Sequence, residues 1–481
     1  MNPVDYSANN MELWNCVIQL GIIAATILVA NIFRRKSSVI RKSMMPTAVL
    51  GGLLLLIVKI VMDRCFGITF LDGTFLEDLT YHGIAIGFIA MSLRNPENSN
   101  SGSMNHVGLR SGACIVSCYM IQGIFGLAIS FGLAYTFMPK LFKASGILLP
   151  LGYGQGPGQA NNTGNVYETD WGFAGGRSFG LAIAAAGYLS ACIVGVIYLN
   201  YLLRKGKIQK QAQEIVDGSV TVDHFQDKDE MPIAESLDRL SMQVALVLAV
   251  YLATFLVTWG ITSGISAISE GLGKTLNGLL WGFNFMIGSG LAIALRVIMQ
   301  KLRKAKVMRK QYRNNYLLSR ISGLAFDIMI IAGIASINIE DLSGLWLPFV
   351  LMAVAGAVIT LFNLKFISKR IYPTYYYEGL MSMYGMMTGT ISSGVLLLRE
   401  VDPGLETPAA NNLITGSSFA IMLGAPMLVL IGMAPKSELM TWIVFGVMVV
   451  YYFILMFLSC GGSGKFRAGE EQSAEQKNVE A

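Results

Sequence analysis

Two glycine-rich stretches carry uncharged polar residues that could bind a small ligand or an ion. The first reads Leu151-Gly-Tyr-Gly-Gln-Gly-Pro-Gly-Gln-Ala-Asn-Asn-Thr-Gly164, and the second reads Met383-Tyr-Gly-Met-Met-Thr-Gly-Thr-Ile-Ser-Ser-Gly394. Gly and Pro interrupt helices, and the backbone groups that they free must find other partners. Neutral oxygens suit Na⁺, whereas amides and hydroxyls together suit a zwitterion. The two stretches therefore predict a site for a small polar solute and a cation.

Two sets of residues follow from this prediction. The predicted substrate-binding set is Gln155, Gly156, Gly158, Gln159, Asn161, Thr388, Gly389, Thr390 and Arg399. The predicted Na⁺-binding set is Asn162, Thr163, Ser392, Ser393, Asp327, Asn411 and Asn412. The Arg399 guanidinium suits a substrate carboxylate because it can donate two parallel hydrogen bonds. Asp327 lies inside an apolar run, where a charged group is costly and needs a partner or a function.

Each of these assignments has a structural alternative. The polar residues of the glycine-rich stretches could cap local turns. Arg399 could anchor the chain at the membrane interface or pair with Glu400, and Asp327 could bond a neighbouring helix. Asn411 and Asn412, just after Pro408, could cap the helix that begins there.

The elements that position these residues are predicted to be membrane-spanning helices. Of the 481 residues, 53% are hydrophobic and only 14% are charged, and the mean hydropathy is +0.54. A soluble domain averages about 25% charged residues. The composition excludes a cytosolic enzyme and a disulfide scaffold, and the basic residues of short loops do not predict nucleic-acid binding.

The apolar runs predict an all-α polytopic protein with about 11 transmembrane helices. Their expected bounds are 14–33, 46–62, 81–93, 112–138, 178–203, 240–262, 278–299, 317–337, 345–366, 412–434 and 439–459. The third run is short, which indicates a tilted, interrupted or wrongly bounded helix. Basic loops follow spans 1, 5, 7 and 9. The positive-inside rule then predicts a multi-pass plasma (cell inner) membrane protein with its N-terminus outside and its C-terminus in the cytoplasm.

The order of the spans predicts two inverted repeats. Residues 1–203 form the first five-helix repeat and residues 239–434 form the second, joined by a cytoplasmic linker at 204–238. An extra helix at 435–460 and a disordered tail at 461–481 follow. The glycine-rich stretches, at about 144–164 and 379–398, occupy matched positions between the fourth and fifth spans. We interpret them as re-entrant hairpins that approach each other from opposite faces of the membrane.

These stretches resemble the glutamate:sodium symporter family. The similar segments are Gly152–Thr163 with Val166-Tyr-Glu168, Ala335-Ser336 through Leu345-Trp346, and Gly385 through Thr388-Gly-Thr390 to Leu398-Arg-Glu400 and Thr407-Pro-Ala-Ala410. The resemblance covers the first ten spans. The sequence departs from the family at the first tip, where a Gly-Gly-His-Gly-Thr pattern is expected and Gly154-Gln-Gly156-Pro-Gly158-Gln159 is found, and also in its long linker and eleventh span.

The resemblance implies a homodimeric, Na⁺-coupled symporter of glutamate or a similar acidic amino acid, with an elevator-like movement. Three alternatives remain at this point. The cargo could be another small carboxylate, or the coupling ion could be H⁺. A channel also uses broken helices. A membrane enzyme is the least favoured, because the sequence offers no nucleophile–base pair and no metal cluster.

Overall fold

The computed structural model describes most of the chain as helices. The described residues are 7, 10–42, 45–94, 106–208, 239–268, 277, 280–282, 284–308, 310–402 and 407–461. Every element within them is a helix, in agreement with the predicted all-α class. Most of the predicted linker and tail, at 209–238 and 462–481, lies outside these residues.

The helices fall into two compact units, each built from segments that are distant in the sequence. Unit 1 comprises Met1–Ser99, Pro157–Ala185 and Gln213–Leu345, and unit 2 comprises Asn100–Gly156, Ala186–Ala212 and Trp346–Ala481. The helices of unit 1 are α1 (Met11–Lys36), α2 (Ser38–Lys42), α3 (Thr47–Phe66), α4 (Gly73–Leu93), α7 (Pro157–Thr169), α10 (Arg239–Ile268), α12 (Asn284–Lys304), α13 (Asn315–Ala335) and the first part of α8 (Gly176–Ser190). The helices of unit 2 are the rest of α8, α5 (His106–Tyr135), η1 (Lys143–Ile147), α6 (Leu148–Pro150), η2 (Leu151–Gln155), η3 (Ala191–Gly195), α9 (Val196–Arg204), α14 (Trp346–Ile371), α15 (Tyr376–Thr388), α16 (Ile391–Leu398), α17 (Ala409–Met433), η5 (Ala434–Lys436) and α18 (Glu438–Cys460).

In the described part of the chain, nine helices are long and apolar enough to cross a membrane. They are Trp14–Lys36, His106–Tyr135, Gly176–Arg204, Arg239–Ala267, Asn284–Lys304, Asn315–Ala335, Trp346–Ile371, Ala409–Lys436 and Glu438–Cys460. Each corresponds to one of the eleven predicted spans. A helical, multi-pass membrane architecture is therefore confirmed, while the inverted repeats and the re-entrant hairpins remain predictions.

The other two predicted spans, 46–62 and 81–93, correspond to α3 and α4. These helices have 20 and 21 residues, which is about 30 Å at 1.5 Å per residue. The prediction placed the start of the third span too late, because α4 already begins at Gly73. The acidic residues Glu77 and Asp78 lower the hydropathy of the first turns of α4. These turns therefore do not appear as part of an apolar run in the sequence.

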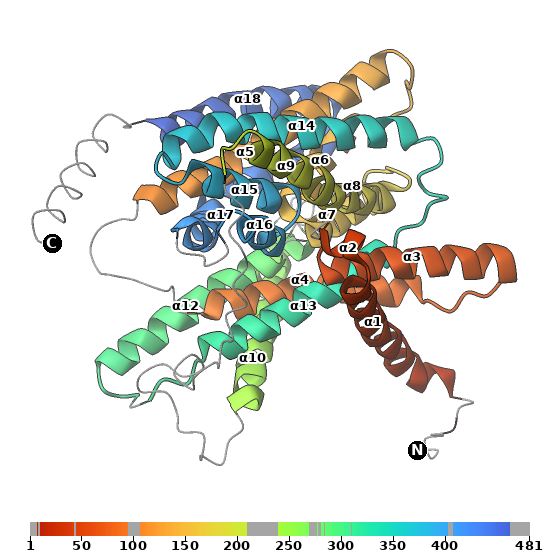
Figure 1. The fold of residues 1–481 in the computed structure, drawn as a ribbon. Helices are drawn as coiled ribbons and strands as arrows, with labels where there is room; N and C mark the ends of the chain where they lie inside the picture. Colours follow the sequence, from red (N-terminus) through yellow and green to blue (C-terminus); the bar gives the residue numbers. More distant parts are fainter. Residues whose placement is uncertain are drawn as a thin grey trace, which may run out of the picture. The chain divides into compact units, whose positions relative to one another are not determined.

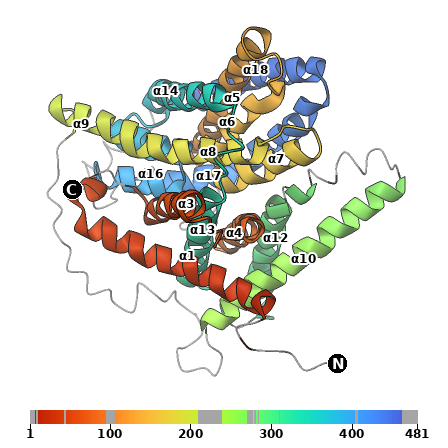
Figure 2. The ribbon, with the colours of Figure 1, turned by 90° about the vertical axis from the view of Figure 1, so that its right-hand side faces the viewer.

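Unit 1 has its core between α4, α10, α12 and α13. Figure 1 shows α4, α12 and α13 side by side, and Figure 2 shows α10 running next to α12. Small residues permit this close packing. A Cβ on Gly87 of α4 would lie 2.4 Å from the Phe326 ring of α13. One cluster of buried core residues in this region consists of Ile89, Ala90, Leu93, Val247, Val250, Ala292 and Leu318.

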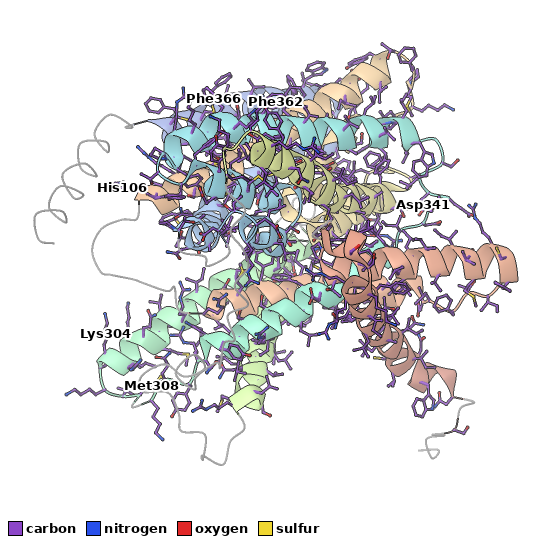
Figure 3. All side chains as sticks on the ribbon, viewed as in Figure 1. His106, Lys304, Met308, Asp341, Phe362 and Phe366 are labelled. Carbon is purple, nitrogen blue, oxygen red and sulfur yellow. The ribbon has the colours of Figure 1, made fainter. Side chains whose placement is uncertain are left out.

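Unit 2 is organised around α5, which packs against α14, α17 and α18. Because α5 lies at the centre of unit 2, it is apolar on all sides rather than along one stripe. The outward side of α14 is also apolar, and Figure 3 labels two of its exposed side chains, Phe362 and Phe366. A row of exposed apolar residues is expected of a helix that faces lipid. The row consists of Leu347, Leu351, Val354, Val358, Phe362 and Phe366.

The start of α4 is fixed by a side-chain cap. Asp72 Oδ1 accepts hydrogen bonds from the backbone N–H groups of Thr74 and Phe75, at 3.0 and 3.3 Å. Asn15 of α1 donates to the other carboxylate oxygen at 2.9 Å. The Asn15 hydrogen bond, together with these backbone donors, holds the pKa of Asp72 below its usual value.

We expect Asp72→Ala to lower the stability of the protein by about 1 kcal/mol, because it removes the cap of α4. Asp72→Asn should retain most of that stability, because asparagine is also a good N-cap residue. Thermal unfolding of the purified variants in one detergent measures both effects. An alanine variant that unfolds at the wild-type temperature would contradict the capping role.

Candidate functional site

The first glycine-rich stretch forms a broken helix. Its first arm consists of η1, α6 and η2 and ends at Gln155, and α7 then begins at Pro157. Between them, Gly156 has φ 90° and ψ −178°, a conformation that essentially only glycine adopts. Pro157 follows as the first residue of α7, where its missing N–H costs nothing. The break thus lies where the sequence predicts it.

The second glycine-rich stretch forms a helical hairpin. Helix α15 ends at Thr388, and α16 starts at Ile391. Between them, Gly389 has φ −149° and ψ −107°, which is neither helical nor extended, and Thr390 is extended. The two helices touch through backbone atoms: a Cβ on Gly385 would lie 2.6 Å from the Ser393 carbonyl oxygen, and one on Gly394 would lie 2.5 Å from the Ser382 carbonyl oxygen. Glycine is required at both contacts, which explains its spacing in the sequence.

The two breaks lie next to each other inside unit 2. A Cβ built on Gly156 would be 3.9 Å from Thr390 Cγ2 and 4.0 Å from the Gly389 carbonyl oxygen. The same position is 3.8 Å from the hydroxyl oxygen of Tyr188, a fully buried side chain. Two stretches more than two hundred residues apart in the sequence therefore place their broken backbones together. We refer to Gly156, Tyr188, Gly389, Thr390 and Ser393 as the break-point cluster.

Polar side chains of unit 2 around these breaks have specific partners. Thr388 Oγ1 donates to the Tyr384 carbonyl at 2.7 Å, which caps its own helix. Gln155 contacts Met427 Sδ through its amide nitrogen at 3.5 Å. Ser393 is different: it is buried, and its hydroxyl has no hydrogen-bond partner among the described residues. The side chain of Ser392 lies outside what the structure describes.

Sequence reasoning missed Gln122, a fully buried glutamine in the middle of α5. Its Nε2 donates to Thr360 Oγ1 at 2.8 Å and to the Met387 carbonyl at 3.0 Å. The Met387 carbonyl belongs to the last turn of α15, directly before the second break. Gln122 thereby ties α5 to the end of that helix. An amide inside a long apolar run was the signal that could have identified it.

Helix α7 carries a row of buried polar residues in unit 1. Gln159, Asn161, Asn162 and Thr163 are each at most 4% exposed. Asn162 Nδ2 donates to the Gly282 carbonyl at 2.7 Å. No partner among the described residues is found for three of the oxygens, Gln159 Oε1, Asn161 Oδ1 and Thr163 Oγ1. An unpaired buried polar group costs about 1–3 kcal/mol, so each of these oxygens is expected to bind a water, an ion or a ligand.

Close contacts fix α7 within unit 1. A Cβ on Gly158 would lie 2.5 Å from Ile84 Cδ1 of α4, and one on Gly164 would lie 2.6 Å from the Gly176 carbonyl at the start of α8. Arg177 of α8, the residue after Gly176, forms an ion pair with Glu77 of α4 and so holds the start of α8 against which Gly164 packs. These contacts leave α7 little freedom to rotate, so the direction of its polar side chains is set by packing.

Three predicted site residues of unit 2 are not brought to the break-point cluster. Arg399 is exposed and lies at the far end of α16, about 12 Å along the helix from its start. Asn412 Nδ2 donates to the Tyr375 hydroxyl, next to the start of α15, and Asn411 lies beside it at the start of α17. Asp327 is exposed on α13 of unit 1 and forms no hydrogen bond or ion pair with another described residue. Their roles in binding remain predictions.

The helix ends at the second break supply both signs of partial charge. The first N–H groups of α16 have no hydrogen-bond partners within that helix. The last carbonyl groups of α15 likewise have no partners within their own helix. A helix N-terminus attracts anions and a C-terminus attracts cations. Thr390 directly precedes α16, and its side chain does not cap the helix. The break can therefore accept a carboxylate and an ammonium or metal cation close together.

The fold and this arrangement define a polytopic helical membrane protein with two adjacent helix breaks in a buried, uncharged environment. Comparison of the chain with protein-family models and with characterised proteins finds no match.

Proposed function

We propose that the protein is a secondary active transporter that couples the uptake of glutamate or a similar acidic amino acid to Na⁺. The observation that carries this proposal is the adjacency of Gly156 and Gly389–Thr390 in unit 2. Broken helices at membrane depth are tolerated where they line a binding site, and transporters use them to bind ions and substrates. The resemblance to glutamate:sodium symporters supplies the substrate class.

The chemistry of the second break fits an amino acid. We assign the substrate carboxylate to the free N–H groups at the start of α16, because Arg399 is exposed at the other end of that helix. The ammonium group is assigned to the carbonyls at the end of α15 and to Gly389. Thr390 and Gln155 flank this position and are available for the polar side chain of the substrate.

Na⁺ is assigned to neutral oxygens that lack partners. Ser393 Oγ is the candidate in unit 2, and Gln159 Oε1, Asn161 Oδ1 and Thr163 Oγ1 are the candidates in unit 1. Gln159 and Thr163 are four residues apart and so share one face of α7. Uncharged oxygens bind Na⁺ without repelling an acidic substrate.

The composition of the two units supports the proposed repeats and motion. The first three long helices of each predicted repeat, α1, α3 and α4 and then α10, α12 and α13, belong to unit 1, whereas the fourth of each, α5 and α14, belongs to unit 2. The first four long helices of the two repeats thus divide in the same way, as expected of an inverted-repeat carrier. We propose a rigid-body movement of one unit as the elevator step, in a homodimer in the cell membrane.

Uptake into proteoliposomes tests the proposal. Radiolabelled glutamate should accumulate when a Na⁺ gradient is imposed, and accumulation should cease when K⁺ replaces Na⁺ outside. Uptake that ignores Na⁺ but follows a pH gradient would replace the coupling ion with H⁺. Inhibition by other carboxylates but not by glutamate would change the cargo, and conductance at rates far above those of a carrier would identify a channel.

We expect Ser393→Ala and Thr163→Val each to weaken the apparent Na⁺ affinity about tenfold, the effect of losing one hydrogen-bond-strength contact to a charged group. Matched controls are Ser382→Ala and Thr80→Val. Their hydroxyls are also buried but donate to backbone carbonyls of their own helices, at 3.0 and 2.8 Å. A Na⁺ titration of uptake measures all four variants. Equal effects in the test and control pairs would show that neither Ser393 nor Thr163 binds Na⁺.

A further inference from the structure

A cluster of basic residues lies far along the chain from the glycine-rich stretches. Between Glu270 and Asp327 the sequence contains no acidic residue. The same segment carries a dense group of cations around the end of α12 and the start of α13. They are Arg296, Lys301, Arg303, Lys304, Lys306, Arg309, Lys310, Arg313 and Arg320. A positive-inside loop explains a general excess of cations, but not where individual side chains point.

Two of these arginines turn towards the C-terminal end of α4 instead of towards solvent. Arg296 Nη1 donates to the carbonyls of Ser92 and Arg94, at 3.1 and 2.9 Å. Arg313 Nη1 donates to the Leu93 carbonyl at 2.8 Å. Three consecutive carbonyls at one helix end therefore receive two guanidinium groups. This is favourable, since a helix C-terminus carries partial negative charge.

The carbonyls neutralise only part of this charge. Arg313 is 4% exposed, and neither it nor Arg296 forms an ion pair with a carboxylate among the described residues. Burial, and then the neighbouring charges of Arg296 and Arg303, lower the pKa of Arg313 to about 10. Buried charges in proteins are usually paired, because desolvation without a counter-ion is costly. Each guanidinium also has five N–H donors, more than these carbonyls use.

The neighbouring surface is apolar. Val297, Ile298 and Leu302 of α12 are exposed, at 39%, 51% and 37%. They occupy the last turns of the helix, between Arg296 and the loop. Figure 3 labels Lys304 at this end of α12, with Met308 in the loop that follows. The buried Arg313, the half-buried Arg296 and the exposed apolar residues at the end of α12 are together complementary to a phosphate group that carries acyl chains.

We propose that Arg296 and Arg313, which contact the C-terminal end of α4, bind a phosphate-bearing anion, which is the headgroup of an acidic phospholipid or a free phosphate. Arginine suits this role because its planar donors match phosphate oxygens in pairs. The bound anion would neutralise Arg313 and join α4, α12 and α13 at one end of unit 1. This inference concerns a site separate from the break-point cluster and does not depend on the proposed transport activity.

Thermal unfolding of the full-length protein in nanodiscs tests the site. The probes are discs of phosphatidylcholine alone, the same discs with phosphatidylglycerol added, and phosphatidylcholine discs with inorganic phosphate in the buffer. We expect phosphatidylglycerol to raise the unfolding temperature. A comparable rise with inorganic phosphate would identify a free anion as the ligand, and a rise with phosphatidylglycerol alone would identify the lipid. No rise in the wild-type protein with either probe would overturn the proposal.

Variants separate the site from general basic charge. Arg296→Gln/Arg313→Gln should weaken phosphatidylglycerol binding, measured by native mass spectrometry, at least tenfold, because two charge-assisted contacts are lost. The matched control, Lys301→Gln/Lys304→Gln, removes the same charge from two exposed residues of the same helix end and should bind as the wild type does. A control that loses binding equally would show a diffuse charge effect and contradict the site. If the arginine variant does not fold, the unfolding temperatures of the wild-type protein with and without phosphatidylglycerol or phosphate still test whether the anion binds.

Discussion

Gly126→Ala is expected to prevent unit 2 from packing correctly, although it adds a single methyl group. A Cβ on Gly126 of α5 would lie 2.1 Å from the Gly146 carbonyl oxygen of η1. In return, a Cβ on Gly146 would lie 2.1 Å from the Gly126 carbonyl carbon. Backbone is in contact with backbone, so no side-chain rotation can relieve the overlap. The first arm of the Gly156 break would have to move away from α5.

The same helix provides the control. Gly132 of α5 has no atom within 4 Å of its Cβ position. Alanine is a better helix former than glycine by about 0.8–1.0 kcal/mol, so Gly132→Ala should be neutral or stabilising. Gly126→Ala should lose more stability than this gain, by roughly 1–3 kcal/mol or more, as overpacked cores do. Unfolding temperature and monodispersity in detergent measure the difference. If the two variants unfold alike, the close approach of α5 and η1 is wrong.

The hydropathy of the sequence predicted most helices because a membrane span has a simple requirement, a sufficient run of apolar residues. The start of α4 was not predicted from hydropathy because a cap and two acidic residues occupy it. Contacts such as that of Gly126 with Gly146 could not be predicted either. A glycine in an apolar helix looks the same whether it faces another backbone or nothing, as Gly126 and Gly132 illustrate.

The candidate site was predictable where backbone chemistry fixes it. Gly156 and Gly389 break their helices because proline, glycine and polar residues cluster there, and this cluster is visible in the sequence. Residues such as Arg399 and Asn412 were assigned by proximity along the chain, whereas their positions depend on helix length. Helix α16 carries Arg399 away from the break, and Asn412 bonds Tyr375 at the opposite end of α15. Gln122 acts through tertiary packing, which a single sequence does not reveal.

Gly156→Ala is expected to reduce Na⁺-driven uptake at least tenfold while the protein still folds. The space at Gly156 is adequate, because the nearest atom to a Cβ would be 3.8 Å away. The obstacle is the backbone conformation, φ 90° and ψ −178°, which costs a non-glycine residue about 1–3 kcal/mol. Alanine would relieve this strain by changing φ, and the chain would then leave the break in another direction. That change would move the backbone away from Thr390 and Gly389.

Gly172→Ala is the matched control. Gly172 also has a positive φ, 71°, and no atom within 4 Å of its Cβ position, but it lies in the turn between α7 and α8. Left-handed backbone costs alanine about 1–2 kcal/mol, so both variants should lose similar stability. Only Gly156→Ala should lose uptake, because only that residue lies beside the second break. Wild-type uptake by a folded Gly156→Ala protein would show that the geometry of the break is not required for transport. Uptake lost equally in both variants would attribute the effect to stability alone.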